Sequence, residues 1–91
     1  MNNDIFVLNE YRAYERALEN FQSRIYKYCT NMENGIRGCK YHMQDEMSQK
    51  ILKDAQQVVD DVKKILDDTQ MNLEMVRRII IKLTSEQTMN M

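Results

Sequence analysis

The chain has 91 residues, no proline, no tryptophan and only two glycines, and 43% of its residues are hydrophobic, 30% charged and 8% aromatic. This composition excludes collagen-like and disordered chains, and the length allows one small domain. A sheet-rich fold of this size needs many turns, yet the residues that form turns are scarce. We therefore expect an all-α protein in which two long helices, joined once, form an antiparallel hairpin.

A heptad pattern of apolar residues predicts the first helix over about residues 7–33. The apolar positions are spaced alternately by four and three residues, and polar side chains fill the positions between them. Tyrosine recurs among them, and it is enriched at protein interfaces where one end of the ring stays wet. The seam predicted to face the core or a partner consists of Val7, Tyr11, Tyr14, Leu18, Phe21, Ile25, Tyr28 and Met32.

The pattern breaks where the two glycines occur, and this predicts a turn over about residues 34–38. Asn34-Gly35 is a common turn dipeptide because both residues tolerate positive φ, and Gly35 suits the position just after a helix. Gly38 permits a second unusual φ or a close approach of the backbone. Gly35, Ile36 and Gly38 are therefore the predicted turn motif.

The second helix is predicted over about residues 39–83, followed by a frayed tail at 84–91. Several apolar positions are doubled, so a lone hairpin would leave part of this wide stripe exposed. We therefore expect a four-helix bundle, formed by dimerisation or by a complex with another helical chain. Its core or partner seam comprises Met43, Met47, Ile51, Val58, Val62, Ile65, Val76 and Ile80.

The residues near the predicted turn that could bind a metal or act in catalysis are Cys29, Cys39 and His42. They lack the closely spaced ligand pairs of zinc sites, so we expect two buried thiols and no metal. A disulfide between the two cysteines is the alternative. A Cys–His nucleophile would lack an oxyanion hole and a closed pocket on two long helices. We predict no enzymatic activity and no cofactor.

Charge and hydropathy argue against nucleic acid and a membrane as partners. Arg77, Arg78 and Lys82 form a small basic patch, but a net charge of −1 lacks the basic excess of nucleic-acid-binding proteins. No stretch is long and apolar enough for a membrane span. The first residues lack the basic and apolar regions of a secretory signal peptide. We therefore expect no nucleic acid and no membrane span.

Ile36-Arg37-Gly38 resembles the W-x-G turn of the small WXG (ESAT-like) proteins of type VII secretion, with isoleucine in place of tryptophan. The length, the two helices, the glycine-containing turn and the lack of a signal peptide are also similar. In that family, antiparallel hairpins pair into four-helix homodimers or heterodimers. Related proteins without the tryptophan bind the N-terminal LXG region of toxins and help to target them for export.

The resemblance implies a non-enzymatic accessory subunit or secreted partner that binds a helical chain such as an LXG region. The family's C-terminal export signal, Y-x-x-x-D/E, has no match after Leu66, which suggests use of a partner's signal. The protein would be cytoplasmic before export and secreted without a cleavable signal peptide. Two alternatives stay open: a self-contained regulatory or structural dimer, such as a phage or host modulator, and a nucleic-acid-associated coiled coil that uses the basic patch.

Overall fold

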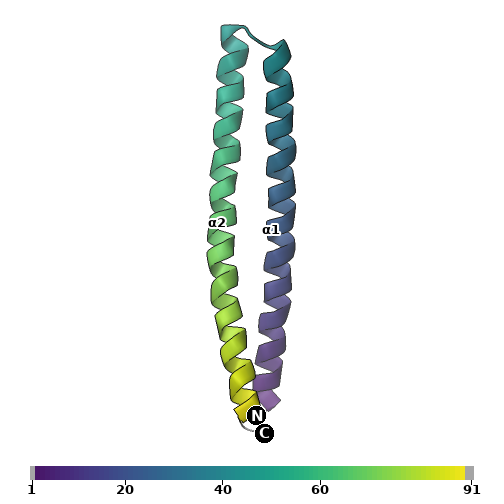
Figure 1. Ribbon diagram of the computed structural model, residues 1–91, viewed down its shortest axis with the longest axis vertical. Helices are drawn as coiled ribbons and strands as arrows, with labels where there is room; N and C mark the ends of the chain where they lie inside the picture. The colour runs from purple at the N-terminus through teal and green to yellow at the C-terminus, as the bar shows by residue number, and fades with distance from the viewer. Residues whose placement is uncertain (1, 90–91) are drawn as a thin grey trace. The chain divides into compact units, whose positions relative to one another are not determined.

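The computed structural model describes residues 2–89, and the side chains of residues 5–88. The described chain contains two helices, α1 (Asn2–His42) and α2 (Glu46–Met89), and no strand. Residues 43–45 connect them, and α2 runs back in the opposite direction (Figure 1). The predicted all-α helical hairpin is therefore confirmed, whereas its assembly into a four-helix bundle stays a prediction.

The hairpin divides into two compact units, each made from one stretch of each helix. The turn unit is Ser23–Asp67 and contains the connection. The terminal unit combines Met1–Gln22 with Asp68–Met91. Each unit buries apolar residues of its own, so each holds together its own stretches of α1 and α2.

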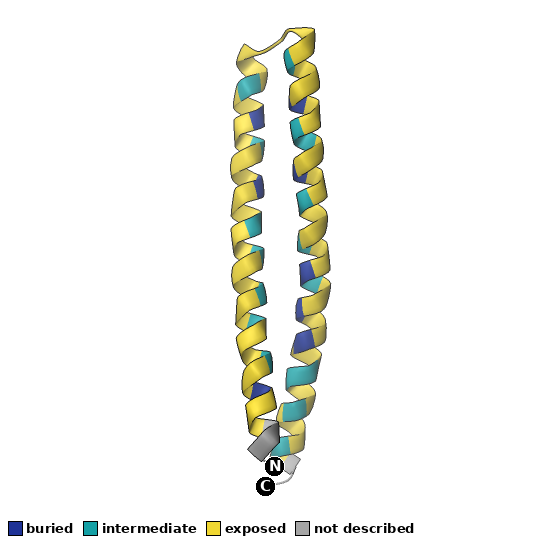
Figure 2. Ribbon diagram, turned by 180° about the vertical axis from the view of Figure 1, so that it is seen from behind, coloured by how far each residue is buried: buried dark blue, intermediate teal, exposed yellow. Residues whose placement is uncertain are grey.

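The core of the turn unit follows a heptad in which two positions, three residues apart, face the other helix. The first seam position is buried: Val59 is 0% exposed and Cys29 is 2% exposed. Figure 2 shows the buried positions on the sides of the helices that face each other. At the first position lie Cys29, Ile36, Leu52 and Val59, and at the second, packed against them, lie Ile25, Cys39, Ala55 and Val62.

The terminal unit has a smaller apolar core and more polar residues along its seam. Leu8, Leu73 and Val76 are buried, and Leu73 is 1% exposed. Thr69 is also buried, at the polar seam position that interrupts the apolar spacing of α2. A polar residue at a seam position reduces the apolar burial of this unit.

The connection lies at residues 43–45, not at about 34–38 as the sequence predicted. α1 continues through Gly35 and Gly38, and neither has a positive φ. A glycine inside a helix costs about 1 kcal/mol relative to alanine. Burial of Ile36, which is 7% exposed, offsets much of this cost, since burying such a side chain contributes about 1.5–3 kcal/mol.

Asp45 caps the start of α2 and so determines where the connection ends. Its Oδ2 accepts a hydrogen bond from the backbone N–H of Ser48 at 3.1 Å. Hydrogen bonding to Ser48, through its side chain and then its backbone, lowers the pKa of Asp45 below 3.8. The cap therefore contributes fully above the unfolded-state pKa, and its contribution is lost as the pH falls through the lower folded-state pKa.

The end of α2 also differs from the sequence prediction. α2 continues to Met89 instead of fraying after residue 83, and residues 90–91 lie outside the described residues. The Thr84 hydroxyl donates to the carbonyl of Ile80 at 2.7 Å, and the Thr88 hydroxyl donates to that of Thr84 at 3.0 Å. These bonds satisfy the hydroxyl groups within the helix, so the polar tail is compatible with helical backbone.

Replacing either glycine of α1 with alanine should raise the free energy of unfolding by about 0.5–1 kcal/mol. Both glycines are helical, and a Cβ added at Gly35 or Gly38 would meet no atom within 4 Å. Urea unfolding of Gly35→Ala and Gly38→Ala, followed by circular dichroism in dilute solution, measures the change. A loss of stability in either variant would contradict a helix through both glycines and would favour a turn there.

Candidate protein-binding surface

The structure separates the sequence-predicted seam residues into two groups. One group lies buried or half-buried between the helices of its unit and comprises Tyr11, Leu18, Ile25, Val62, Val76 and Ile80. The other group is 42–73% exposed and comprises Tyr14, Phe21, Tyr28, Met43, Met47, Ile51, Val58 and Ile65. The second group therefore does not belong to the core of the hairpin, although the sequence placed both groups on one seam.

The exposed group differs from the core because, in pairs of neighbouring residues, the second member faces the other helix. In α1 the buried residue is Cys29, while its neighbour Tyr28 is 59% exposed. In α2 the buried residue is Val59, while its neighbour Val58 is 52% exposed. The exposed residue in each pair directly precedes a first seam position. We call this exposed set in the turn unit the apolar row, and it consists of Tyr28, Ile51, Val58 and Ile65.

The apolar row lies on one face of the turn unit. Because the two right-handed helices run in opposite directions, the residue before a first seam position points to the same side in both. The residue after a second seam position points to the opposite side. Glu33 and Lys63 occupy such positions, and Lys63 Nζ lies 2.9 Å from Glu33 Oε1. The two faces of the turn unit therefore differ, one being apolar and the other crossed by an ion pair.

The ion pair between Glu33 and Lys63 links the two helices of the turn unit. The hydrogen bond to Glu33 raises the pKa of Lys63, which keeps its ammonium group charged. Both side chains are partly exposed, so solvent screens the attraction and its contribution to stability is small. The contact shows which residues of α1 and α2 lie at the same level.

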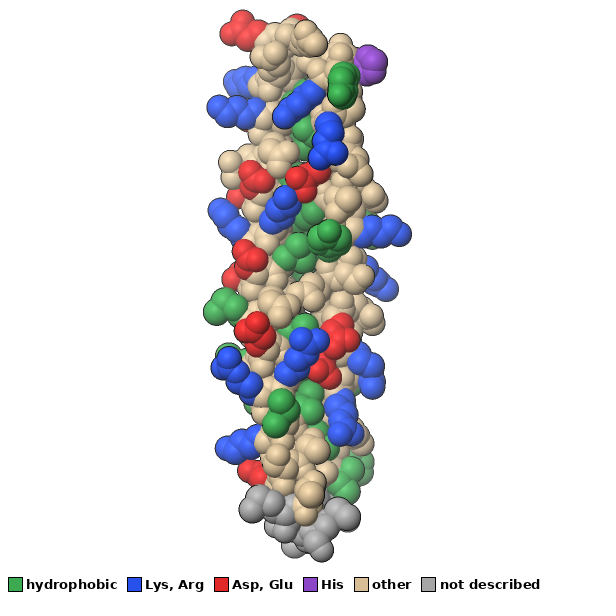
Figure 3. Space-filling view, viewed as in Figure 1, with side chains coloured by type: hydrophobic (Ala, Val, Ile, Leu, Met, Phe, Trp, Pro, Cys, Tyr) green, Lys and Arg blue, Asp and Glu red, His purple; other side chains and the backbone are tan. Residues whose placement is uncertain are grey.

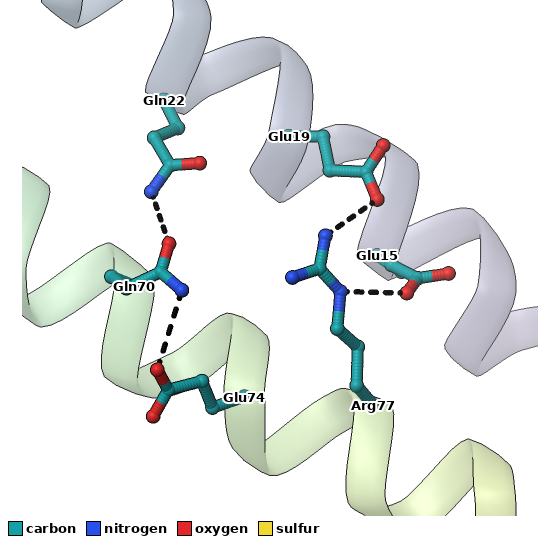
Figure 4. Close-up of polar contacts among 6 residues, drawn as sticks. All are labelled: Glu15, Glu19, Gln22, Gln70, Glu74 and Arg77. Carbon is teal, nitrogen blue, oxygen red and sulfur yellow. Dashed lines mark hydrogen bonds and ion pairs between the residues drawn. The ribbon is translucent and has the colours of Figure 1, made fainter.

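Two ion pairs cross the seam in the terminal unit and engage Arg77 (Figure 4). Its Nη2 lies 3.1 Å from Glu19 Oε1, and its Nε lies 3.2 Å from Glu15 Oε2. Hydrogen bonds to Glu19 and then Glu15 raise the pKa of Arg77. Because two carboxylates hold this guanidinium, the predicted basic patch with Arg78 and Lys82 has a weaker positive field for nucleic acid.

Side-chain amides of glutamine form hydrogen bonds in the next part of this seam. Gln22 Nε2 donates to Gln70 Oε1 at 2.6 Å, and Gln70 Nε2 donates to Glu74 Oε1 at 3.3 Å (Figure 4). Figure 3 shows acidic and basic side chains together along the line where the helices meet on one face. These polar pairs explain why Glu15 and Gln22 occupy seam positions that a purely hydrophobic pattern assigns to their neighbours.

Exposed apolar residues also precede the seam in the terminal unit. Val7, Tyr14 and Phe21 are 42%, 46% and 42% exposed, and each directly precedes a seam residue of α1. The equivalent positions of α2 hold the exposed Asn72 and the half-buried Ile79. The terminal unit therefore presents an apolar strip mainly from α1, whereas both helices contribute to the apolar row of the turn unit.

The cysteines are free, and they belong to the core rather than to a reactive site. Cys29 is buried and Cys39 is half-buried, both on α1 and ten residues apart. At a rise of 1.5 Å per residue they are separated by about 15 Å, too far for a disulfide within one chain. The described residues contain no group of three or more His, Cys, Asp or Glu side chains that could hold a metal ion.

Two pockets of the turn unit differ in the side chains that line them. One lies near the connection and has no carboxylate, histidine or cysteine among its lining residues. The other contains Glu33 and Lys63, which are paired with each other, beside the buried Cys29.

In the described part of the chain, neither helix is long and apolar enough to cross a membrane. No family model matches the sequence, and no curated protein or solved structure matches it either. The exposed apolar row is therefore the feature of the described chain that points most directly to a partner.

Proposed function

We propose that this protein is a non-enzymatic protein-binding module whose apolar row packs against the helices of another chain. One observation carries this proposal: Tyr28, Ile51 and Val58 are 59%, 60% and 52% exposed on one face of the turn unit. Apolar residues that repeat every heptad are the pattern through which amphipathic helices bind one another. A second helical layer over this face would complete a four-helix bundle.

The energetics support a partner. Burying a large aliphatic or aromatic side chain contributes about 1.5–3 kcal/mol, and the row side chains have about half of that gain still available. A short chain buries a small fraction of its surface, so its own core supplies limited stability. Association would therefore stabilise the hairpin and bind the partner at the same time.

Within this class, we favour an accessory subunit or secreted partner in type VII secretion that binds a helical chain such as an LXG toxin region. The support is the helical hairpin together with the resemblance of chain length. Ile36 is buried between the helices, where it would hold α1 against α2. The protein would then be cytoplasmic before export.

A charged residue in the apolar row tests this function. The wild-type protein, Val58→Asp and the control Met71→Asp are each co-expressed with the helical N-terminal region of an LXG toxin. Met71 is also an exposed apolar residue of α2, 67% exposed, but it lies outside the row. Binding is measured by co-purification and light scattering, and helicity by circular dichroism.

The wild type and Met71→Asp should bind, whereas Val58→Asp should remain helical and lose the partner. Equal binding by both variants would show that the row is not the binding surface. A wild-type protein that stays monomeric and binds no helical chain would refute the protein-binding function.

A further inference from the structure

We propose that the pocket beside the connection binds a small amphiphilic anion, a molecule with one anionic head and a short apolar chain. The pocket lies within the turn unit and has a volume of about 540 Å³. Pockets that bind small organic molecules in proteins have volumes of about 300–1,000 Å³. The pocket is therefore large enough for a ligand of this kind.

The pocket opens on the face that carries the ion pair of the turn unit, opposite the apolar row. Lys40 and Gln56 both line it. Each directly follows a second seam position, which is occupied by Cys39 in α1 and by Ala55 in α2. Residues that follow a second seam position point away from the apolar row on both helices. A ligand in the pocket would not compete with a protein on the row, so this inference does not depend on the proposed function.

The heptad that forms the pocket differs in charge from the heptad next to it. Farther from the connection, Lys63 Nζ lies 2.9 Å from Glu33 Oε1, so a cation of α2 is balanced by an acid of α1. Lys40 lies one heptad after Glu33, so a lysine replaces the acid on α1. Gln56 lies one heptad before Lys63, and its amide donates to Asp60 Oδ1 at 3.0 Å. The positive charge of Lys40 is therefore not balanced by the facing residue of α2.

Two lysines supply the anion-binding part of the pocket. Lys40 comes from the last turn of α1 and Lys53 from α2, and both are exposed. Neither has an ion-pair partner among the described side chains, and no carboxylate lines the pocket. Figure 3 shows basic side chains on both helices near the connection. Because both ammonium groups attract an anion in the pocket, it favours a negatively charged ligand over a neutral or positive one.

The pocket also offers apolar surface to a ligand. Leu52, a core residue, and Met43, which is 45% exposed in the connection, both line it. The aliphatic stems of the two lysines add apolar surface below their charged ends. An inorganic anion would leave this surface in water, whereas an alkyl chain would cover it. Charge and apolar surface together therefore favour an anion with an alkyl chain, such as a medium-chain carboxylate.

Titration with decanoate, followed by two-dimensional NMR of the isotope-labelled protein, tests this site. The wild type is compared with Lys40→Gln, Lys53→Gln and the double variant. The control Lys50→Gln removes the same charge from an exposed residue of α2 near the connection that does not line the pocket. Acetate supplies the charge without the chain, and decyltrimethylammonium supplies the chain with the opposite charge. All ligands are kept below their micelle concentrations, and circular dichroism verifies that each variant remains helical.

Decanoate should shift the amide signals of residues around the pocket. Each lysine variant should raise its Kd about two- to fivefold, and the double variant should raise it further. High salt should also weaken binding, whereas Lys50→Gln should change it little. A wild type that does not bind decanoate, or shifts confined to the apolar row, would overturn the proposal. So would equal affinity of the wild type and the double variant, or binding of acetate or decyltrimethylammonium as tight as that of decanoate.

Discussion

Val59→Asp should leave the chain largely unfolded, whereas Val58→Asp should leave both helices folded. Val59 is 0% exposed at the centre of the turn-unit core, whereas Val58 is 52% exposed. A carboxylate buried among apolar side chains without a partner costs several kcal/mol, and a domain of this size has about 5–15 kcal/mol in total. The same charge at Val58 remains in contact with water.

Far-ultraviolet circular dichroism and urea unfolding distinguish the two variants in dilute solution, where association contributes least. The comparison is closely matched, because both positions hold valine, both are in α2, and both acquire the same charge. If Val58→Asp were the more damaging variant, positions 51, 58 and 65 would face α1 and form the core, as the sequence predicted. Equal effects would indicate that neither valine is central to packing within the hairpin.

Leu73→Ala should lower the free energy of unfolding by about 2–5 kcal/mol. Leu73 is 1% exposed and is the most completely buried large side chain of the terminal unit. Its truncation removes apolar burial and leaves a cavity that straight helices cannot readily close. Ile81→Ala is the control, because Ile81 is 66% exposed and such surface changes shift stability by about 0.5 kcal/mol or less.

Hydrogen exchange shows where the Leu73→Ala variant loses protection. Amides of the terminal unit should exchange faster than those of the turn unit, since each unit has a core of its own. Equal loss throughout both helices would show that the two units unfold as one cooperative body. Unchanged protection in the terminal unit would contradict the burial of Leu73.

The fold class could be predicted from the sequence because two local properties agree. Apolar residues recur with heptad spacing, and turn-forming residues are too few for more than one connection. The position of that connection could not be predicted in the same way. Gly35 and Gly38 have low helix propensity, but the burial of Ile36 between them keeps α1 intact, and the cap at Asp45 starts α2.

The candidate surface was only partly predictable for a related reason. The sequence identifies Tyr28 and Val58 as members of apolar heptad repeats, but their neighbours Cys29 and Val59 are also apolar. Local spacing cannot decide which member of such a pair faces the other helix. In the terminal unit, hydrophobicity even favours the wrong member of the pair. The polar Gln22 lies in the seam, where it donates a hydrogen bond to Gln70, and its larger apolar neighbour does not.

By itself, then, the sequence determined that this chain forms two amphipathic helices with more apolar surface than one hairpin covers. Only the tertiary structure decided how far each helix is rotated about its axis, and thereby which apolar residues are core and which remain exposed. The reason is physical: helix formation depends on local spacing, whereas rotation depends on contacts between distant residues, such as the packing of Cys29 and Ile36 with Leu52 and Val59.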